Sequence, residues 1–225
     1  MQDQQAHLSW RDGDVPVSDR FDDPYFSLEN GLAETRHVFL TGNGLPDRFR
    51  NGFHVAELGF GTGLNFLATL RAWREAGAPG AMTFTSFEAF PMAAPDMARA
   101  LAAFPELGDE AAALLAAWNG TAAGPVTVAD GVTLALVRGD ARDTLPVWEG
   151  QADAWFLDGF SPAKNPELWG EALMAQVFAL TAPGGTAATY TAAGFVRRGL
   201  ASAGFAVTRV PGYGRKRHMT RAERP

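Results

Sequence analysis

The sequence predicts an α/β fold in which a mainly parallel sheet is covered by helices on both faces. Three observations support this fold class. From residue 53 onward, segments with strand-like and helical patterns alternate; a glycine-rich turn follows the first of these strands; and the chain ends in a two-stranded hairpin. Alternating strands and helices favour parallel pairing, because parallel strands need a crossover connection that a helix supplies.

Seven segments have the apolar, β-branched or aromatic composition of strands. They are residues 53–60, 82–90, 132–137, 154–157, 186–191, 205–210 and 216–221. The third can begin as early as Val126 and turn at Asp130-Gly131, and the last two flank a Pro-Gly-Tyr-Gly turn that indicates a hairpin. We therefore expect a mainly parallel seven-stranded sheet with a C-terminal antiparallel hairpin. This is the Rossmann-like order of class I methyltransferases rather than that of dehydrogenases.

Helices are expected between these strands and before the first one. They are residues 32–40, 63–76, 94–118, 166–180 and 192–203. The alanine-rich segment 94–118 forms one or two helices, with a break at Phe104-Pro105 because proline does not continue a helix. Apart from its short helix, the N-terminal part of about forty residues is expected to be irregular.

Composition indicates one globular domain outside any membrane. Of 225 residues, 47% are hydrophobic and 20% are charged. The sequence has no run of eighteen apolar residues, and its polar start does not resemble a signal peptide. It contains no cysteine, which excludes disulfides and a thiolate nucleophile, and its four histidines lack metal-ligand spacing. We expect a cytoplasmic protein with no metal and no membrane partner.

Charge is distributed unevenly along the chain. The net charge is −6, but residues 1–194 carry 11 Lys/Arg against 24 Asp/Glu, a balance of −13, whereas residues 195–225 carry 8 Lys/Arg against one Glu, a balance of +7. A basic end on an acidic body indicates a polyanion-binding edge. A solvated tail that only aids solubility has the same pattern, so charge alone leaves both interpretations open.

The first strand runs into a glycine-rich turn, Glu57-x-Gly59-x-Gly61-Thr62-Gly63, which is followed by Leu64-Asn65. Glycines at alternate positions permit positive φ angles and let a ligand lie against bare backbone. Their spacing differs from the dinucleotide fingerprint, and no Walker-type Lys-Ser or Lys-Thr follows. The turn favours a cofactor without a pyrophosphate, although a tight strand-to-helix turn without any ligand uses similar glycines.

Acidic residues end the next two strands. Glu88 closes the second strand, where a carboxylate can accept hydrogen bonds from both hydroxyls of a ribose. Asp140-Ala141 follows the third strand, where a carboxylate can meet an adenine amino group. Each acid alone is weak evidence, since surface acids are common at strand ends. Together with the glycine turn they outline a site for an adenosine without phosphates, and S-adenosyl-L-methionine is the ordinary cofactor of that description.

The fourth strand ends at Asp158, which is followed by Gly159-Phe160-Ser161-Pro162. Glycine and proline impose a rigid, exposed turn that would place the carboxylate beside the methyl group of the cofactor. An alkyl amine has a pKa of ~10 and arrives protonated, so a carboxylate there can hold the ammonium and accept a hydrogen bond as the proton leaves. Alternatively, Asp158 caps the helix near Pro166 or pairs with Lys164.

Six longer motifs are shared with one known family. They read FDDPYFS (21–27), GLxETRxVFL (31–40), ExGFGTGLNFL (57–67), DAWFLDGFSPAKNPxxW (153–169), GFVRRGL (194–200) and GRKR (214–217). Over about residues 8–222 the chain resembles the methyltransferase domain of the MnmC-type bifunctional protein that makes 5-methylaminomethyl-2-thiouridine in tRNA. The fourth motif and the GRKR motif are not general features of methyltransferases, so the resemblance is more specific than the glycine turn.

The resemblance implies N-methylation of 5-aminomethyl(-2-thio)uridine at the tRNA wobble position, with S-adenosyl-L-methionine as methyl donor. Residues 1–52 would cover substrate and cofactor, and residues 53–225 would form the methyltransferase domain, within one structural domain. Asp158 would be catalytic, and the cofactor would be bound by Glu57, Gly59, Gly61, Thr62, Gly63, Asn65, Glu88, Asp140, Ala141 and Asp158. The substrate would be contacted by Tyr25, Glu34, Asn43, Phe160 and Lys164.

The resemblance makes tRNA the expected partner of the basic end. The anticodon stem-loop phosphates would be neutralised by Arg197, Arg198, Arg215, Lys216 and Arg217. The target base must leave its stack, and Phe160 or Trp169 either stacks on it or packs in the core. The family continues into a flavin-dependent oxidase domain that supplies the amine. For this chain we expect a separate FAD-dependent oxidase, another source of the amine, or an excised domain.

Two other functions fit part of the sequence. A small-molecule amine methyltransferase or aminopropyltransferase of the same fold would also place acids near a cationic amine, but it would not need arginines clustered at the chain end. A non-catalytic tRNA-binding module with a degenerate cofactor pocket would explain the basic end. It would not explain the intact glycine turn together with Asp158.

Overall fold

The computed structural model describes residues 5–11, 14–27, 30–118 and 124–225. A central sheet is built from β4 (Phe53–Leu58), β5 (Met82–Glu88), β6 (Val126–Ala129), β7 (Val132–Arg138), β8 (Ala152–Leu157), β9 (Thr181–Thr189), β10 (Ala206–Pro211) and β11 (His218–Glu223). The strands lie in the order β10-β11-β9-β8-β4-β5-β7-β6. Strands β7, β5, β4, β8 and β9 pair in parallel, and β11 is antiparallel to both β9 and β10. The expected fold class is confirmed.

The sheet has eight strands rather than the expected seven. Residues 126–129 form a strand of their own, β6, which runs antiparallel to β7 at the edge of the sheet. The chain reverses at Asp130-Gly131, where Gly131 takes a φ of 68°, a value that favours glycine. The turn was predicted, but the separate edge strand was not.

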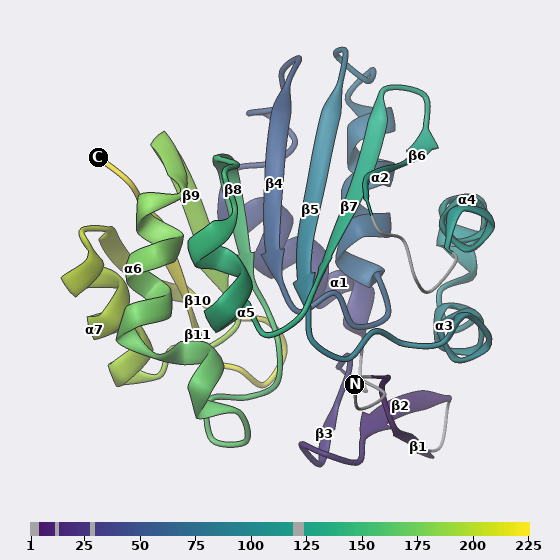
Figure 1. Cartoon of the computed structure of the whole chain (residues 1–225), viewed down its shortest axis with the longest axis horizontal. Coiled ribbons are helices and arrows are strands. Elements are labelled where there is room, and N and C mark those ends of the chain that lie inside the picture. Colours follow the sequence, from purple (N-terminus) through teal and green to yellow (C-terminus); the bar gives the residue numbers. More distant parts are fainter. Residues whose placement is uncertain (1–4, 12–13, 28–29, 119–123) are drawn as a thin grey trace.

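A second, small sheet corrects the expectation that the N-terminal part is irregular. It consists of β1 (Leu8–Arg11), β2 (Val15–Ser18) and β3 (Asp23–Pro24), all antiparallel. In β2 all four residues are buried, although Pro16 argues against a strand when the sequence is considered alone. Figure 1 shows this sheet beyond the carboxyl ends of β4 and β5. Tertiary burial of Val15 and Val17 therefore decides the local structure here.

Seven α-helices are described. They are α1 (Gly31–Thr35), α2 (Leu64–Glu75), α3 (Ala94–Leu101), α4 (Gly108–Ala117), α5 (Ala141–Thr144), α6 (Glu171–Ala179) and α7 (Gly194–Ala203). Helix α1 continues into a π-helical turn, Arg36–Leu40, and a 3₁₀ turn, Thr41–Asn43. The predicted break at Phe104-Pro105 is confirmed, because the 3₁₀ turn Pro105–Leu107 separates α3 from α4. Two more 3₁₀ turns lie at Leu145–Val147 and Pro166–Trp169.

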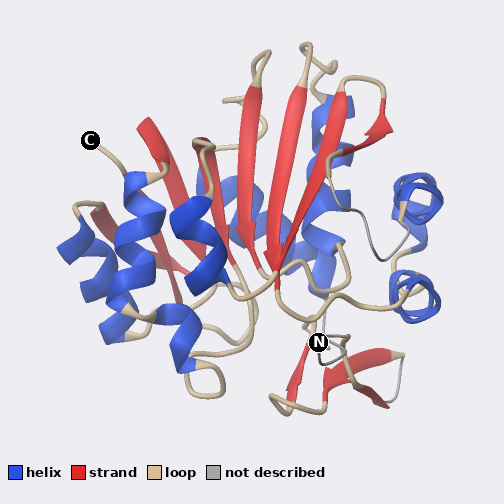
Figure 2. Cartoon of the chain, in the orientation of Figure 1, coloured by secondary structure: helices blue, strands red, loops and turns tan. Residues whose placement is uncertain are grey.

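Helices cover both faces of the sheet (Figures 1 and 2). In β8, Ala154 and Phe156 pack into the core on the side of α1 to α4, and Trp155 and Leu157 pack into the core on the side of α5 to α7. All four side chains are fully buried, as expected for a parallel strand covered on both faces. Within the described ranges, no helix combines the length and apolar character needed to cross a membrane.

This arrangement brings the ends of several strands to one place. Strands β4, β5, β8 and β9 run parallel, so their carboxyl ends meet at the same edge of the sheet. In open α/β sheets this edge is where ligands bind. The glycine turn, Glu88, Asp158 and Tyr190 follow or end these four strands.

Candidate active site

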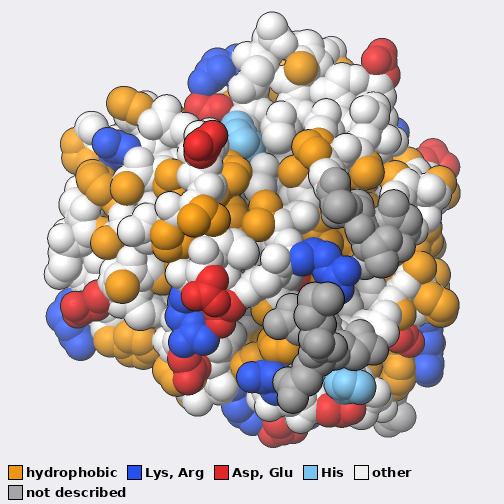
Figure 3. All heavy atoms as spheres, in the orientation of Figure 1, with side chains coloured by type: hydrophobic (Ala, Val, Ile, Leu, Met, Phe, Trp, Pro, Cys, Tyr) orange, Lys and Arg blue, Asp and Glu red, His pale blue; other side chains and the backbone are white. Residues whose placement is uncertain are grey.

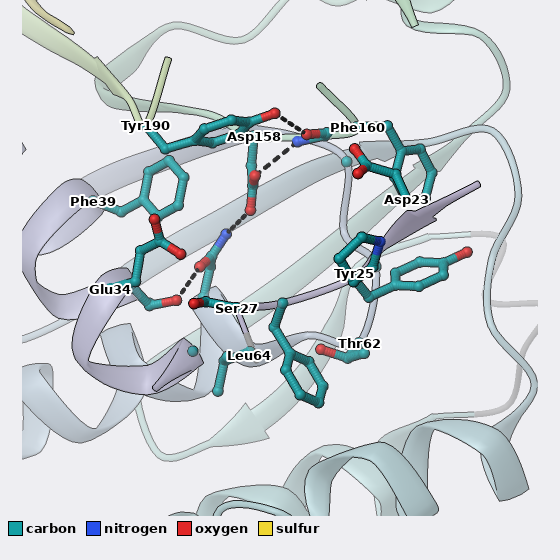
Figure 4. Close-up of a pocket in the computed structure, with 18 of the residues that line it drawn as sticks. Asp23, Tyr25, Ser27, Glu34, Phe39, Thr62, Leu64, Asp158, Phe160 and Tyr190 are labelled. Atoms are coloured by element: carbon teal, nitrogen blue, oxygen red, sulfur yellow. Dashed lines mark hydrogen bonds between the residues drawn. The ribbon is translucent and has the colours of Figure 1, made fainter. Parts of the chain in front are cut away.

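A cavity of ≈ 420 Å³ opens at the carboxyl edge of the sheet, a size suited to a small molecule. Three parts of the chain line it. The N-terminal segment contributes Asp23, Tyr25, Phe26, Ser27, Glu34, Thr35 and Phe39; the strand ends contribute Gly59, Phe60, Gly61, Thr62, Leu64, Asn65, Glu88, Asp158, Phe160 and Tyr190; the C-terminal hairpin contributes Tyr213, Arg215 and Lys216. Eleven of the predicted site residues are among them. Figure 4 shows how several of these side chains converge.

The glycine turn presents bare backbone to this cavity. Gly59 and Gly61 line it, with φ angles of 84° and 55°. A Cβ atom on Gly61 would lie 3.1 Å from Cδ1 of Tyr25, and one on Gly59 would lie 3.2 Å from Cα of Gly159. Gly63 does not line the cavity; it precedes α2 with a φ of 81°, against Leu114 and Phe60. A side chain at Gly59 or Gly61 would strain the backbone and narrow the cradle.

Glu88 supports the glycine turn. Its carboxylate accepts the backbone N–H of Gly61 at 3.0 Å and that of Phe90 at 2.7 Å. Burial raises the pKa of Glu88, and the donated N–H groups oppose that rise. A carboxylate has about four acceptor positions, so capacity remains for the ribose hydroxyls assigned to it. The cradle and this acid together fit an adenosine cofactor.

Asn65 connects the predicted catalytic carboxylate to a second one. Its amide Nδ2 donates to Oδ2 of Asp158 and to Oε1 of Glu57, both at 2.8 Å, and its Oδ1 accepts from the hydroxyl of Thr35 at 2.9 Å. The hydroxyl of Ser86 donates to the other oxygen of Glu57 at 2.6 Å. One amide therefore holds two carboxylates, and the hydrogen bond from Thr35, the last residue of α1, fixes the orientation of that amide.

Burial changes the acidity of both carboxyl groups. It raises the pKa of Asp158 to about 6, although the bonds from Asn65 and the N–H of Gly159 oppose that rise. Glu57 is fully buried, and burial raises its pKa well above the ordinary value. Asp158 contacts Asn65 rather than the Pro166 turn, and Lys164 pairs with Asp22 instead. Asp158 therefore neither caps the turn at Pro166 nor pairs with Lys164.

The C-terminal hairpin reaches across the cavity to α1. Nζ of Lys216 lies 2.6 Å from Oε1 of Glu34 and 4.3 Å from the ring centroid of Tyr190. The hydroxyl of Tyr190 donates to the carbonyl of Gly159 at 2.9 Å, next to Asp158. Lys216 was predicted to contact RNA phosphates, but its ammonium group is engaged inside the site.

Asn43 and Lys164, predicted to contact substrate, lie outside the cavity lining. Asn43 is fully buried, donates to the carbonyls of Phe39 and Trp155, and accepts from Thr186. All its polar atoms are used to join the N-terminal segment to the sheet. Lys164 is bonded to Asp22 at 2.6 Å. Both expectations came from sequence position, which does not show where a side chain finds its partner.

Asp140 and Ala141 also lie outside the cavity lining. The carboxylate of Asp140 accepts the backbone N–H of Arg142 as the N-cap of α5 and pairs with the guanidinium of Arg142 at 2.6 Å. These interactions lower the pKa of Asp140. In this structure the carboxylate of Asp140 is therefore bonded to Arg142 rather than directed into the cavity, and the adenine contact assigned to it stays a prediction.

The predicted aromatic and basic residues divide between the cavity and the exterior. Phe160 lines the cavity and stacks on Phe21 with ring centroids 4.6 Å apart, whereas Trp169 is 1% exposed and belongs to the core. Arg215 lines the cavity beside Lys216. Outside the lining lie Arg197, Arg198 and Arg217.

Three functional candidates were missed in the sequence. Tyr190 directly follows β9, so the same strand-end argument that selected Glu88 and Asp158 would have found it. Thr35 lies in one of the six motifs, but its role is the hydrogen bond that it donates to Asn65, 30 residues away. Asp23 accepts the backbone N–H of Ser161 at 2.8 Å and so ties β3 to the turn after β8. Neither long-range contact has a signal in the sequence.

The fold and the cavity define a class: Rossmann-like proteins that bind a phosphate-free adenosine cofactor at the carboxyl edge of the sheet. The chain belongs to the S-adenosyl-L-methionine-dependent methyltransferase family, whose family model matches residues 105–225. S-adenosyl-L-methionine is thus its cofactor, and methyl transfer its reaction class. Among the described residues, no group of three or more His, Cys, Asp or Glu could hold a metal ion.

Relatives support this assignment. The chain is 50% identical over 97% of its length to the tRNA 5-methylaminomethyl-2-thiouridine biosynthesis bifunctional protein MnmC of Caulobacter vibrioides, and 48% identical over 96% to the protein of that name from Pseudomonas paraeruginosa. It spans only 38% and 34% of those relatives. The crystal structure of MNMC2 from Aquifex aeolicus superposes with a TM-score of 0.76 at 23% identity, covering 100% of this chain and 72% of that one.

Replacing Gly61 with alanine should weaken cofactor binding about tenfold, since a left-handed alanine costs about 1–2 kcal/mol and its Cβ would press on Tyr25. Calorimetric titration with S-adenosyl-L-methionine measures this loss. Gly52→Ala is the matched control, because Gly52 also has a positive φ, 76°, but has nothing within 4 Å. Equal affinities in the two variants would show that the turn does not shape the cofactor site.

Proposed function

We propose that the chain methylates the primary amine of 5-aminomethyl(-2-thio)uridine at the wobble position of tRNA, giving 5-methylaminomethyl(-2-thio)uridine. The observation that carries the proposal is the Asp158 carboxylate, which faces the cavity and is held in place by Asn65 and the N–H of Gly159. Identity of 48–50% to proteins named for this modification supports the choice of substrate.

The chemistry begins with an amine that arrives protonated. When bound, S-adenosyl-L-methionine supplies an electrophilic methyl group on a sulfonium. Asp158 attracts the substrate ammonium, orients it and accepts its proton; with a pKa of about 6 it is a stronger base than an ordinary aspartate. Once the nitrogen lone pair is free, the amine would attack the methyl group that the cofactor would supply, with the thioether as leaving group, and the product would be a secondary ammonium. Most of the catalysis is positioning, as expected for an in-line displacement.

The surrounding residues hold and cover the reactants. Glu88 binds the ribose hydroxyls, and the backbone of Gly59 and Gly61 lies against the cofactor. Asn65 and Glu57 orient Asp158. We assign residues 1–52 to covering the site, since Tyr25 and Glu34 line the cavity from that segment.

The tRNA would lie along the C-terminal basic residues. Arg209, Arg217 and Arg197 gather around His218, where burial and these positive charges lower the pKa of the imidazole. Together with Arg198 and Arg215 they would contact phosphates of the anticodon stem-loop. The face seen in Figure 3 carries acidic and basic side chains intermixed and presents no single-sign surface to a polyanion. The target base would stack against Phe160 at the cavity.

The amine must come from another activity. The relatives are named bifunctional, and this chain spans 34–38% of their length. We assign supply of the aminomethyl group to an FAD-dependent oxidase activity and place the reaction in the cytoplasm, where tRNA is modified.

The deciding experiment incubates the protein and S-adenosyl-L-methionine with tRNA that lacks only the final methyl group. After digestion, mass spectrometry should show one added methyl on the wobble nucleoside. The same tRNA lacking the aminomethyl group is the control and should gain none. A methyl group on any other nucleoside, or none at all, would refute the proposed substrate.

A further inference from the structure

Lys216 occupies a position suited to a small organic cation. Its ammonium is 2.6 Å from a carboxylate oxygen of Glu34 and 4.3 Å from the ring centroid of Tyr190. A cation between a carboxylate and an aromatic face is a common way for proteins to bind alkylammonium groups. The side chain of Glu34 is only 13% exposed, so its negative charge needs a positively charged partner to offset the loss of solvation.

This position is continuous with the site of methyl transfer. Glu34, Tyr190 and Asp158 line the same cavity and converge in Figure 4. The charges of Lys216 and Glu34 both act on Asp158: Lys216 lowers the pKa of that carboxyl and Glu34 raises it. A cation at the position of Lys216 Nζ is therefore electrostatically coupled to the group assigned to the amine.

We propose that Glu34 and Tyr190 form a recognition site for the alkylammonium group of the substrate, and that Lys216 fills this site until the substrate ammonium replaces it. The inference rests on the proposed function in one respect: it requires a substrate that carries a cationic amine. It makes Lys216 an internal competitor that keeps Glu34 paired in the absence of substrate.

The geometry allows Lys216 to leave and restricts what can replace it. Its side chain is 45% exposed and lies in the loop between β10 and β11, beside Gly214 with a φ of 57°. Rotation about side-chain bonds takes the ammonium into solvent without moving the sheet. A neutral group entering in its place would leave the carboxylate of Glu34 unpaired, which is costly at low exposure. The exchange thus selects a cationic substrate over an unmodified uridine.

The test measures binding of the nucleoside 5-aminomethyluridine to protein saturated with S-adenosylhomocysteine, so that no methyl transfer occurs. Lys216→Met removes the competitor and should tighten binding about tenfold if Lys216 occupies the site nine-tenths of the time. Adding Glu34→Gln to Lys216→Met should weaken binding about tenfold relative to Lys216→Met alone, through loss of a charge-assisted hydrogen bond. Arg221→Met, an equal charge change at an exposed position of β11 outside the cavity lining, is the control and should leave affinity unchanged.

With 5-aminomethyluridine, two results would overturn the inference: Lys216→Met leaves the affinity unchanged, or Lys216→Met weakens it, which would make Lys216 a direct substrate contact. The affinity for plain uridine should be the same in all variants. A tenfold gain in uridine affinity in Lys216→Met would show that the site does not recognise charge and would also contradict the inference. Because the readout is binding, failure of tRNA methylation would refute the proposed function without touching this result. Conversely, normal methylation with no tightening in Lys216→Met would refute only the exchange.

Discussion

Asp158→Ala is expected to lower kcat by about 10²-fold or more, while the Kd for S-adenosyl-L-methionine stays within about threefold. The substitution removes the group assigned to receive the proton and to orient the ammonium. It leaves Gly59, Gly61 and Glu88 in place to hold the cofactor. Single-turnover methylation of tRNA measures the first quantity, and calorimetric titration measures the second.

A matched control separates this role from general loss of charge. Asp143 is an exposed acid in α5, outside the cavity lining, and Asp143→Ala should retain wild-type turnover. Turnover of Asp158→Ala near that of Asp143→Ala would remove Asp158 from the mechanism. A large loss of cofactor affinity in Asp158→Ala would instead assign the residue to cofactor binding.

Asn65→Ala is expected to have the second largest effect. It removes the amide that donates hydrogen bonds to both Asp158 and Glu57, and it should lower kcat by up to ~10²-fold through misplacement of Asp158. Loss of hydrogen bonds to two buried or partly buried carboxylates should also lower the free energy of unfolding by about 2–4 kcal/mol. Denaturant unfolding and tRNA methylation measure the two effects.

The pH profile distinguishes positioning from simple destabilisation. Asp158 must be ionised to accept a proton, so kcat/KM should fall as pH decreases through its pKa. The bond from Asn65 lowers that pKa, so Asn65→Ala should move the acid limb to higher pH. Asn43→Ala is the control: this buried asparagine lies outside the cavity, and its loss should reduce stability without moving the limb. An unmoved limb in Asn65→Ala would leave Asn65 with a structural role only.

Much of the fold follows from local patterns. The helix Leu64–Glu75 and the strands Phe53–Leu58 and Met82–Glu88 form within a few residues of their predicted bounds, because each carries its own hydrophobic period. The N-terminal part was expected to be irregular, yet residues 15–18 form β2, in which Val15 and Val17 are buried. Sheet formation there depends on what the strand packs against, and propensity alone does not contain that information.

The sequence by itself determined the groups that belong to strand ends. The glycines after β4, Glu88 at the end of β5 and Asp158 after β8 are local features, and the carboxyl ends of parallel strands meet at one edge of the sheet. Only the tertiary structure decided which of these groups bond to one another. Asn65 donates hydrogen bonds to Glu57 and to Asp158, and Asp158 is 93 residues away from it in the sequence. Lys216 bonds to Glu34, from which it is separated by 182 residues. Asp140 and Asn43 show the converse: both were assigned to the site from their place in the sequence, but Asp140 bonds to Arg142 and Asn43 bonds to the backbone of Phe39 and Trp155. Hydrogen bonds and ion pairs form between whichever groups folding brings within about 3 Å, and a linear motif does not encode that distance.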